Sequence, residues 1–198
     1  METSLLLSMA GFALAMSITP GPVNLVALGS GARHGFAASL RHVVGATLGF
    51  ILLLLLMGLG LGATLLQWPL AADALRWAGV IFLGWMAWQL LVDSGRVEGV
   101  DGVAPSFWYG ALMQRLNPKA WLFALSAIGV FVPPQSTLHD GPLLTLCLMS
   151  LAACLVGVGC WALLGRALMA WLHTPGRQRA LHRVLAALLL MSVLGMLA

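Results

Sequence analysis

Long runs of apolar residues, separated by short polar stretches, extend along the whole chain. A helix rises about 1.5 Å per residue, so about 20 apolar residues cross a bilayer core of about 30 Å. The pattern predicts an all-α integral membrane protein with a single domain, residues 1–198, and six transmembrane helices. We place the spans at residues 4–32, 39–66, 71–92, 107–132, 142–168 and 180–198, with residues 93–105 as the longest polar linker.

The first span is interrupted by the stretch Thr19-Pro20-Gly21-Pro22-Val23-Asn24. The apolar residues before it, Ser4 to Ile18, would form a helix of roughly 22 Å, too short to cross the hydrocarbon core. Residues on both sides are therefore needed for one crossing, and the prolines break a helix inside the membrane. Irregular backbone at that depth is tolerated where it is packed in protein or lines a wet cavity, and broken helices often mark a transporter's binding site.

The fourth span has a second interruption, Gln114-Arg115-Leu116-Asn117-Pro118-Lys119. The apolar residues after it, 120–132, would cover only about 20 Å as a helix. Asn is a strong N-cap, and Pro suits the first helical position. A new half-helix is therefore predicted to begin at Asn117, and by the same logic another begins near Thr19-Pro20.

Each interruption opens a set of three spans. Because three is odd, the second set is reversed relative to the first, and we predict two inverted repeats, residues 1–92 and 106–198. The two half-helix N-termini would then offer free N–H groups and partial positive charge to an anionic group such as a carboxylate. The candidate substrate-binding residues are Thr19, Pro20, Gly21, Pro22, Asn24, Gln114, Asn117, Pro118 and Lys119.

The polar residues of the interruptions each allow two interpretations. Lys119 brings a full charge to membrane depth, which makes it a functional candidate. If the break lay nearer the cytoplasmic surface, Lys119 and Arg115 would instead extend to the lipid headgroups and act as topology signals. Asn24, Gln114 and Thr19 could hydrogen-bond a ligand, or they could satisfy backbone groups that the prolines leave free.

Composition supports the membrane assignment. Hydrophobic residues make up 61% of the chain, charged residues 8%, and the mean hydropathy is +0.97, whereas a soluble domain carries about 25% charged residues. The net charge of +4 does not indicate nucleic-acid binding, because the basic residues cluster in a few loops without interleaved aromatic residues. Cys147, Cys154 and Cys160 have no His or acidic partners in their segment and are interpreted as small apolar residues. We expect no metal and no cofactor.

Lys and Arg residues concentrate in the first, third and fifth connections between spans. This asymmetry places those connections in the cytoplasm and both termini outside. Two glycine pairs, Gly45 with Gly49 and Gly58 with Gly62, have the four-residue spacing that lets helices approach closely in lipid. The close approach could lie within the chain or between two copies of it.

Four motifs occur together at characteristic positions. They are Thr19-Pro20-Gly21-Pro22, Gly31-Ala32-Arg33-His34-Gly35, the Gly45 and Gly49 pair, and Leu116-Asn117-Pro118-Lys119-Ala120-Trp121 followed by Phe123-Ala124-Leu125. In these motifs, and in its length and six apolar segments, the chain resembles the LysE/RhtB superfamily of bacterial amino-acid exporters. The resemblance implies secondary export of amino acids or close derivatives across the bacterial inner membrane, driven by an ion gradient as proton antiport. It also implies a homodimer.

The distribution of acidic residues bears on the substrate. No Asp or Glu lies within the core of a predicted span, because Asp73, Asp93, Glu98, Asp101 and Asp140 are all in or near loops. A cationic side chain crossing a low dielectric would need a carboxylate partner. We therefore expect a neutral substrate resembling homoserine, threonine or leucine. The coupling residue is not identified by the sequence. Imidazole is the side chain that ordinarily titrates near neutral pH, so His34 and His42 are the candidates for such a role. We favour the other interpretation, that both are interfacial residues at the cytoplasmic end of the second span.

Two other functional classes serve as alternatives. An inorganic cation exporter of a related branch would need intramembrane carboxylates, thiolates or His clusters, and the three cysteines are its only support. A membrane-embedded enzyme would need a nucleophile with a base, and Ser30, Ser126 and Ser150 have no His or acid nearby in sequence. We expect a transporter rather than an enzyme, with an amino acid, protons and the lipid bilayer as its partners.

Overall fold

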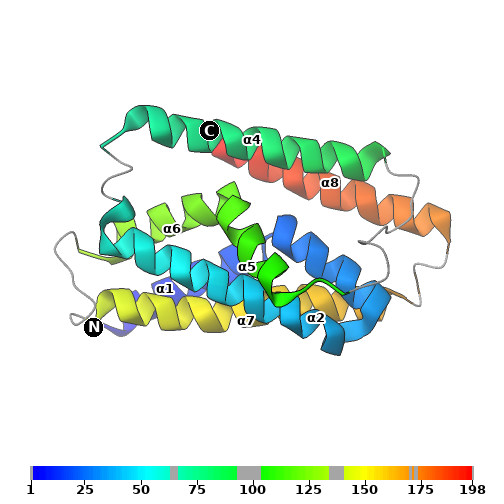
Figure 1. Ribbon diagram of the computed structural model, residues 1–198, viewed down its shortest axis with the longest axis horizontal. Coiled ribbons are helices and arrows are strands. Elements are labelled where there is room, and N and C mark those ends of the chain that lie inside the picture. The colour runs from blue at the N-terminus through cyan, green and yellow to red at the C-terminus, as the bar shows by residue number, and fades with distance from the viewer. Residues whose placement is uncertain are drawn as a thin grey trace.

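The computed structural model describes residues 2–62, 67–92, 104–133, 141–169, 171 and 174–197. Every regular element in these ranges is a helix, and the helices run roughly along one long axis (Figure 1). They are α1 (Thr3–Ile18), α2 (Pro22–Leu56), the short π-helix η1 (Met57–Leu61), α4 (Pro69–Val92), α5 (Phe107–Leu116), α6 (Pro118–Phe131), α7 (Pro142–Met169) and α8 (Pro175–Leu197). The predicted all-helical architecture is confirmed for these residues.

Helix α2 reverses direction at Gly35. The backbone there has φ 78° and ψ 168°, a conformation open to glycine and strained for other residues. Two hydrogen bonds join the parts on either side: Ser30 Oγ to Ser39 Oγ at 2.7 Å, and the Nε2 of His42 to the carbonyl of Val23 at 3.2 Å. Residues 22–34, the first arm, and residues 36–56, the second arm, therefore form an antiparallel hairpin (Figure 1).

The helix bounds follow the predicted spans closely. α1 and the first arm cover the first span, and α5 and α6 cover the fourth. α4 and α7 begin and end within two residues of the third and fifth spans. α8 begins at Pro175, five residues before the position at which we place the start of the sixth span. Its first turn is polar, and the amides of Arg177 and Gln178 bond the carbonyl of Thr174, a boundary that hydropathy does not register.

Two helical segments have by themselves the length and the apolar composition of a membrane-crossing helix. One is Pro22–Leu61, counted through the reversal of α2 at Gly35 and on through η1, and the other is α7 (Pro142–Met169); both are long and apolar enough to cross a membrane. Among the residues that the structure describes, no other helix is both long and apolar enough to cross a membrane. α1, residues 76–92 of α4, and α6 are shorter apolar helices. These features agree with a helical membrane protein.

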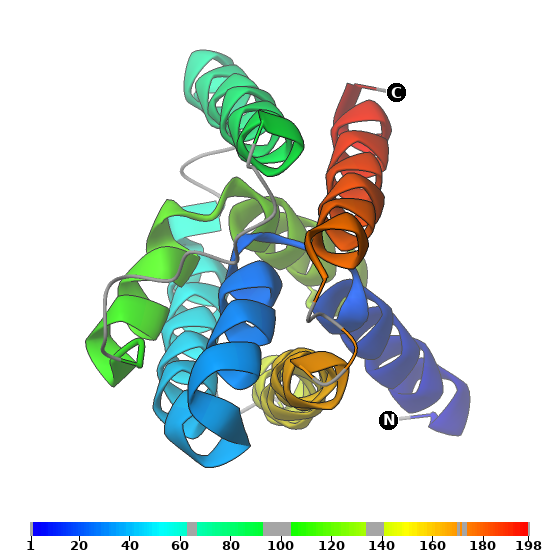
Figure 2. The ribbon, with the colours of Figure 1, turned by 90° about the vertical axis from the view of Figure 1, so that its right-hand side faces the viewer.

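Helix α7 packs along both α1 and α2, and α2 also packs along α5. α4 and α8 pack against each other and form a pair along one side of the bundle (Figure 2). The largest apolar core lies between α1, α2, α6 and α7 and includes an aromatic cluster. The ring of Phe123 lies 5.1 Å from that of Phe12 and 4.9 Å from that of Phe50, centroid to centroid.

Glycines allow the backbones of α2 and α5 to touch. A Cβ added to Gly49 would lie 2.7 Å from the carbonyl oxygen of Ala111, and one added to Gly45 would overlap the carbonyl of Phe107. On the other side of this contact, a Cβ on Gly110 would meet the carbonyl of His42. The Gly45 and Gly49 pair therefore packs within the chain, which decides between the two interpretations of its spacing.

Candidate functional site

The first break lies between α1 and α2. The amide and the hydroxyl of Thr19 both donate to the carbonyl of Ala15, at 3.0 and 2.6 Å, so Thr19 still belongs to the last turn of α1. Gly21 is then the extended N-cap of α2, and Pro22 occupies its first turn. The predicted break is confirmed, but the new helix begins at Pro22 and not at Thr19-Pro20.

The carbonyls at the end of α1 are bound by side chains from other helices. Asn24 is buried, and its amide donates to the carbonyls of Ser17 and Thr19, each at 2.9 Å. The indole of Trp161 on α7 donates to the carbonyl of Ile18 at 2.8 Å. These bonds satisfy backbone groups that a broken helix leaves without intrahelical partners. Of the two interpretations of Asn24, the structure therefore supports the one in which it stabilises the break.

The second break has the local geometry that its sequence predicts. Asn117 is extended, with φ −88° and ψ 103°, and lies between α5 and α6. Its Oδ1 accepts a hydrogen bond from the amide of Lys119 at 3.2 Å, as an N-cap does, and its Nδ2 donates to the Oε1 of Gln114 at 3.2 Å. Pro118 begins α6. The prediction of a half-helix starting at Asn117 is confirmed.

Lys119 joins the two breaks. Its ammonium group donates to the carbonyl of Thr19 and lies 3.5 Å from the carbonyl of Pro20, 100 and 99 residues away in the chain. The carbonyl end of a helix favours a cation at this place. Gly21 leaves room for the lysine stem, because a Cβ there would lie 3.2 Å from its Cδ. Lys119 thus turns inward to the first break, whereas Arg115 is exposed.

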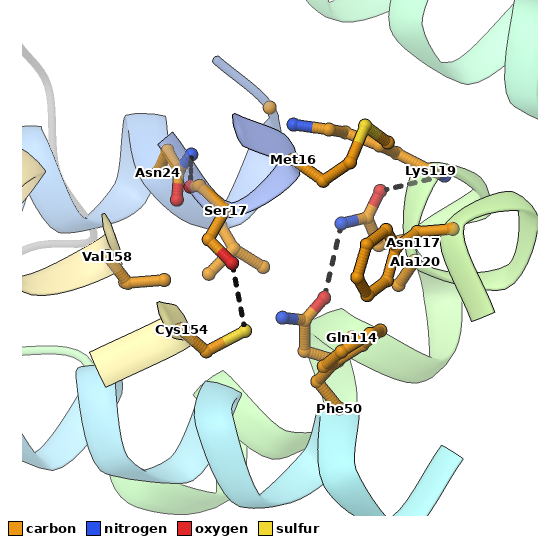
Figure 3. Close-up of a pocket in the computed structure, with 13 residues that line it drawn as sticks. Met16, Ser17, Asn24, Phe50, Gln114, Asn117, Lys119, Ala120, Cys154 and Val158 are labelled. Atoms are coloured by element: carbon orange, nitrogen blue, oxygen red, sulfur yellow. Dashed lines mark hydrogen bonds between the residues drawn. The ribbon is translucent and has the colours of Figure 1, made fainter. Parts of the chain in front are cut away.

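A cavity of about 50 Å³ lies where the breaks meet (Figure 3). By volume it has room for a few water molecules. One part of its wall is polar and the rest is apolar, and none of the described residues that line it is acidic. The lining residues are Met16, Ser17, Gly21, Val23, Asn24, Phe50, Gln114, Asn117, Lys119, Ala120, Phe123, Cys154 and Val158.

The predicted site residues divide into two groups. Gly21, Asn24, Gln114, Asn117 and Lys119 line the cavity. The remaining four shape the breaks around it: Thr19 offers its carbonyl to Lys119, Pro20 lies beside it, and Pro22 and Pro118 begin the two half-helices.

Sequence reasoning missed a sulfur-containing part of the cavity wall. The Sγ of Cys154 lies 3.4 Å from the Oγ of Ser17, and both residues line the cavity together with Met16 (Figure 3). Cys154 was interpreted only as a small apolar residue of α7. Nothing in its own segment marks the side of α7 that faces the cavity. Ser17 was detectable in principle, since it lies two residues before the first break.

His42 is enclosed in the protein and does not face its surface. The imidazole is fully buried, with 0% of its surface exposed, because α5 covers the second arm at this position. Its Nδ1 has no hydrogen-bond partner among the described residues. His34 is half-buried near the Gly35 corner, so the two histidines lie in different environments.

The acidic residues that the structure describes lie away from the cavity. Glu2 and Asp73 are exposed. Asp93, Glu98, Asp101 and Asp140 lie outside the described residues. In the described part of the chain, no group of three or more His, Cys, Asp or Glu side chains is placed to hold a metal ion.

The family described as LysE type translocator matches residues 14–197. A cysteine/O-acetylserine efflux protein of Escherichia coli (strain K12) is 33% identical over 190 residues, which cover 96% of this chain and 95% of that protein. The protein of the same description from Escherichia coli O139:H28 is 32% identical over 191 residues, covering 96% of each chain. No solved structure shows significant similarity. The family match and these relatives extend over almost the whole length, and the chain therefore belongs to the LysE type translocator family.

Proposed function

We propose that this protein is a secondary exporter of a small neutral amino acid or a close derivative, and that its substrate site is the cavity between the two helix breaks. The observation that carries the proposal is the position of Lys119, which crosses from the second break to the carbonyls of the first. The family match and the efflux function in the names of its relatives support export across the inner membrane by a multi-pass protein.

The cavity offers two kinds of positive charge to a carboxylate. Lys119 supplies an ammonium group, and Val23 and Asn24 lie in the first turn of α2, where backbone N–H groups have no intrahelical acceptor. In the proposed complex the substrate carboxylate displaces the carbonyls of Thr19 and Pro20 from Lys119. A charge-assisted hydrogen bond of this kind is among the stronger polar contacts in proteins.

The remaining wall suits a short, uncharged side chain. Phe50, Phe123 and Val158 are apolar, and Cys154 with Ser17 adds one weakly polar place. Among the described residues, the lining contains no carboxylate that could pair with a cationic side chain, and an unpaired charge in such a place is costly. The relatives' names give cysteine and O-acetylserine as their substrates, and both compounds have neutral side chains. We therefore add them to the homoserine-, threonine- and leucine-like compounds that we propose as candidate substrates.

Transport by alternating access follows from the same arrangement. We infer that the two halves, each beginning with a broken helix, are inverted repeats that move against each other around the cavity. The outward position of both termini, proton antiport and the homodimer belong to the same proposal. Contact between the breaks through Lys119 supports it, since movement of either half would change the contacts of the cavity.

Selectivity can be tested by efflux from intact cells. Cells that express the protein are loaded with dipeptides that release cysteine, O-acetylserine, homoserine, threonine, leucine, lysine or arginine, and the medium is sampled with time. We expect expression to speed the outward appearance of one or more neutral compounds, and to leave lysine and arginine at the rate of cells carrying an empty vector. Faster efflux of lysine or arginine would contradict the neutral-substrate proposal. No acceleration of any compound would contradict the export function itself.

A further inference from the structure

His42 is a titratable group enclosed within the hairpin of α2. The side chain is fully buried in the second arm and does not line the cavity. Its Nε2 lies 3.2 Å from the carbonyl of Val23, and its Nδ1 has no hydrogen-bond partner in the part of the chain that the structure describes. Buried polar atoms are nearly always paired, so an unpaired one calls for a reason.

The imidazole is coupled directly to the cavity through Val23. Val23 lines the cavity and lies in the first turn of α2, immediately after Pro22. Its carbonyl contacts His42, so the ring and the cavity touch the same residue from two sides. A change of charge on the ring therefore acts on a residue that a bound substrate would also contact.

Helix α5 connects the imidazole to the second break as well. The ring of Tyr109 lies 6.1 Å from the imidazole, centroid to centroid, and Gly110 packs on the carbonyl of His42. α5 continues from there to Gln114 in the cavity wall. His42 thus lies where both broken helices meet the second arm.

In the part of the chain that the structure describes, few ionisable side chains face the imidazole. The first arm presents the carbonyl of Val23, and the cluster beside the second arm brings apolar residues of α7. From α5 the facing titratable group is Tyr109. Arg41, next to His42 in the chain, is exposed. Imidazole is the side chain whose ordinary pKa lies closest to neutral pH.

We propose that His42 is the proton-coupling group of the exporter. In the neutral ring, Nε2–H donates to the carbonyl of Val23 and Nδ1 carries the lone pair. A proton taken from the outer aqueous phase binds Nδ1 to give the imidazolium, and the same proton leaves Nδ1 to the cytoplasm. One proton enters for each turn of the carrier, and the neutral ring is restored. The inference rests on the proposed function, because it assigns the ion site of that transport.

The burial of His42 couples the binding of the proton to the binding of the substrate. An imidazolium sealed in an apolar place is costly, so protonation favours a conformation in which water reaches the ring. Substrate in the cavity favours the closed arrangement around Val23. A carrier that holds either the proton or the substrate, but not both, is an antiporter, since each ligand selects the state that it binds better.

Buried hydroxyl groups extend from the corner of the hairpin toward the ring. Ser39 Oγ donates to the carbonyl of Gly35 at 2.9 Å and lies 2.7 Å from the Oγ of Ser30. Ser39 precedes His42 by three residues and therefore lies on the same side of the helix. Both hydroxyls are buried. Both belong to the part of the hairpin between the Gly35 corner and the contact of His42 with Val23.

The test uses the purified full-length protein in liposomes, with radiolabelled L-cysteine kept reduced as the probe. The main variant is His42→Gln, because the amide nitrogen of Gln can take the place of Nε2 and still donate to Val23, whereas it cannot titrate. The matched control is His182→Gln, which removes another buried imidazole that does not line the cavity. Two quantities are measured. The first is the rate at which labelled cysteine exchanges for unlabelled cysteine at equal pH on both sides, and the second is the uptake of labelled cysteine against its own concentration gradient into vesicles with an acidic lumen.

With a lumen one pH unit more acidic than the medium, and with potassium and valinomycin present to hold the membrane potential at zero, antiport of one proton per substrate supports accumulation of about 10-fold. We expect wild type and His182→Gln to approach this value. His42→Gln should exchange cysteine at a rate close to wild type but fail to accumulate it. Accumulation by His42→Gln equal to wild type, or loss of accumulation in His182→Gln with His42→Gln intact, would overturn the assignment. Absence of exchange in the wild type would instead refute export of cysteine by this site, a failure of the proposed function.

Discussion

Replacement of Lys119 by alanine is expected to reduce amino-acid efflux by about 100-fold, because a hydrogen bond to a charged group contributes about 1.5–3 kcal/mol and Lys119 is proposed to make more than one in the transport cycle. In the structure its ammonium reaches the carbonyls of Thr19 and Pro20, so it serves both breaks. Efflux is measured in cells with equal amounts of protein in the membrane fraction, since the prediction concerns transport and not insertion.

Two variants control this experiment. Lys119→Arg retains the charge but replaces a compact ammonium with a planar group, and it should recover part of the activity. Arg115→Ala removes a cation on the other side of the same break, where the side chain is exposed and does not line the cavity. It should export at nearly the wild-type rate. Wild-type efflux by Lys119→Ala would remove Lys119 from the site, and equal losses in Lys119→Ala and Arg115→Ala would indicate a general effect of charge.

The second large effect is expected at the contact of α2 with α5. Gly45→Ala places a methyl group against the carbonyl of Phe107, and a backbone atom cannot turn aside as a side chain can. Overpacking of this kind costs about 1–3 kcal/mol, so the melting temperature of the purified protein in detergent should fall by about 5 °C. Thermal unfolding followed by size-exclusion chromatography with fluorescence detection measures the shift.

Gly129→Ala is the matched control for Gly45→Ala. Gly129 lies within α6, and a Cβ added there meets no atom within 4 Å. Alanine has the higher helix propensity, so this variant should melt at or slightly above the wild-type temperature. If Gly45→Ala melted like Gly129→Ala, the close approach of α2 and α5 would not hold in the protein.

The helix breaks could be predicted because their signals are local. Pro118 after Asn117 fixes a helix start by capping and backbone geometry alone, and the structure reproduces it. The first break was placed correctly but its helix start was not, since two prolines offered two starts. The structure has the helix start at Pro22, because Thr19 still donates two hydrogen bonds to the carbonyl of Ala15 in the last turn of α1. That choice depends on the turn preceding the prolines, which hydropathy does not resolve.

The composition of the cavity could be predicted only in part, because it depends on contacts between distant segments. Cys154 and Ser17 meet through the packing of α7 on α1, which nothing in either segment specifies. His42 was assigned to the membrane interface from its position near the end of a span. Its burial follows from the hairpin at Gly35 and the cover provided by α5. Neither feature has a sequence signal as local as an Asn-Pro cap.

The central claim is that the two breaks form one site in which Lys119 holds the substrate carboxylate. Competition in the exchange assay tests it most directly, with labelled L-cysteine as the substrate and two competitors, unlabelled L-cysteine and cysteamine, its analogue without the carboxylate. We expect cysteamine to compete about 100-fold more weakly than cysteine in the wild type, and this difference to disappear in Lys119→Ala. Equal competition by the two compounds in the wild type, or an undiminished preference for cysteine in Lys119→Ala, would contradict the account.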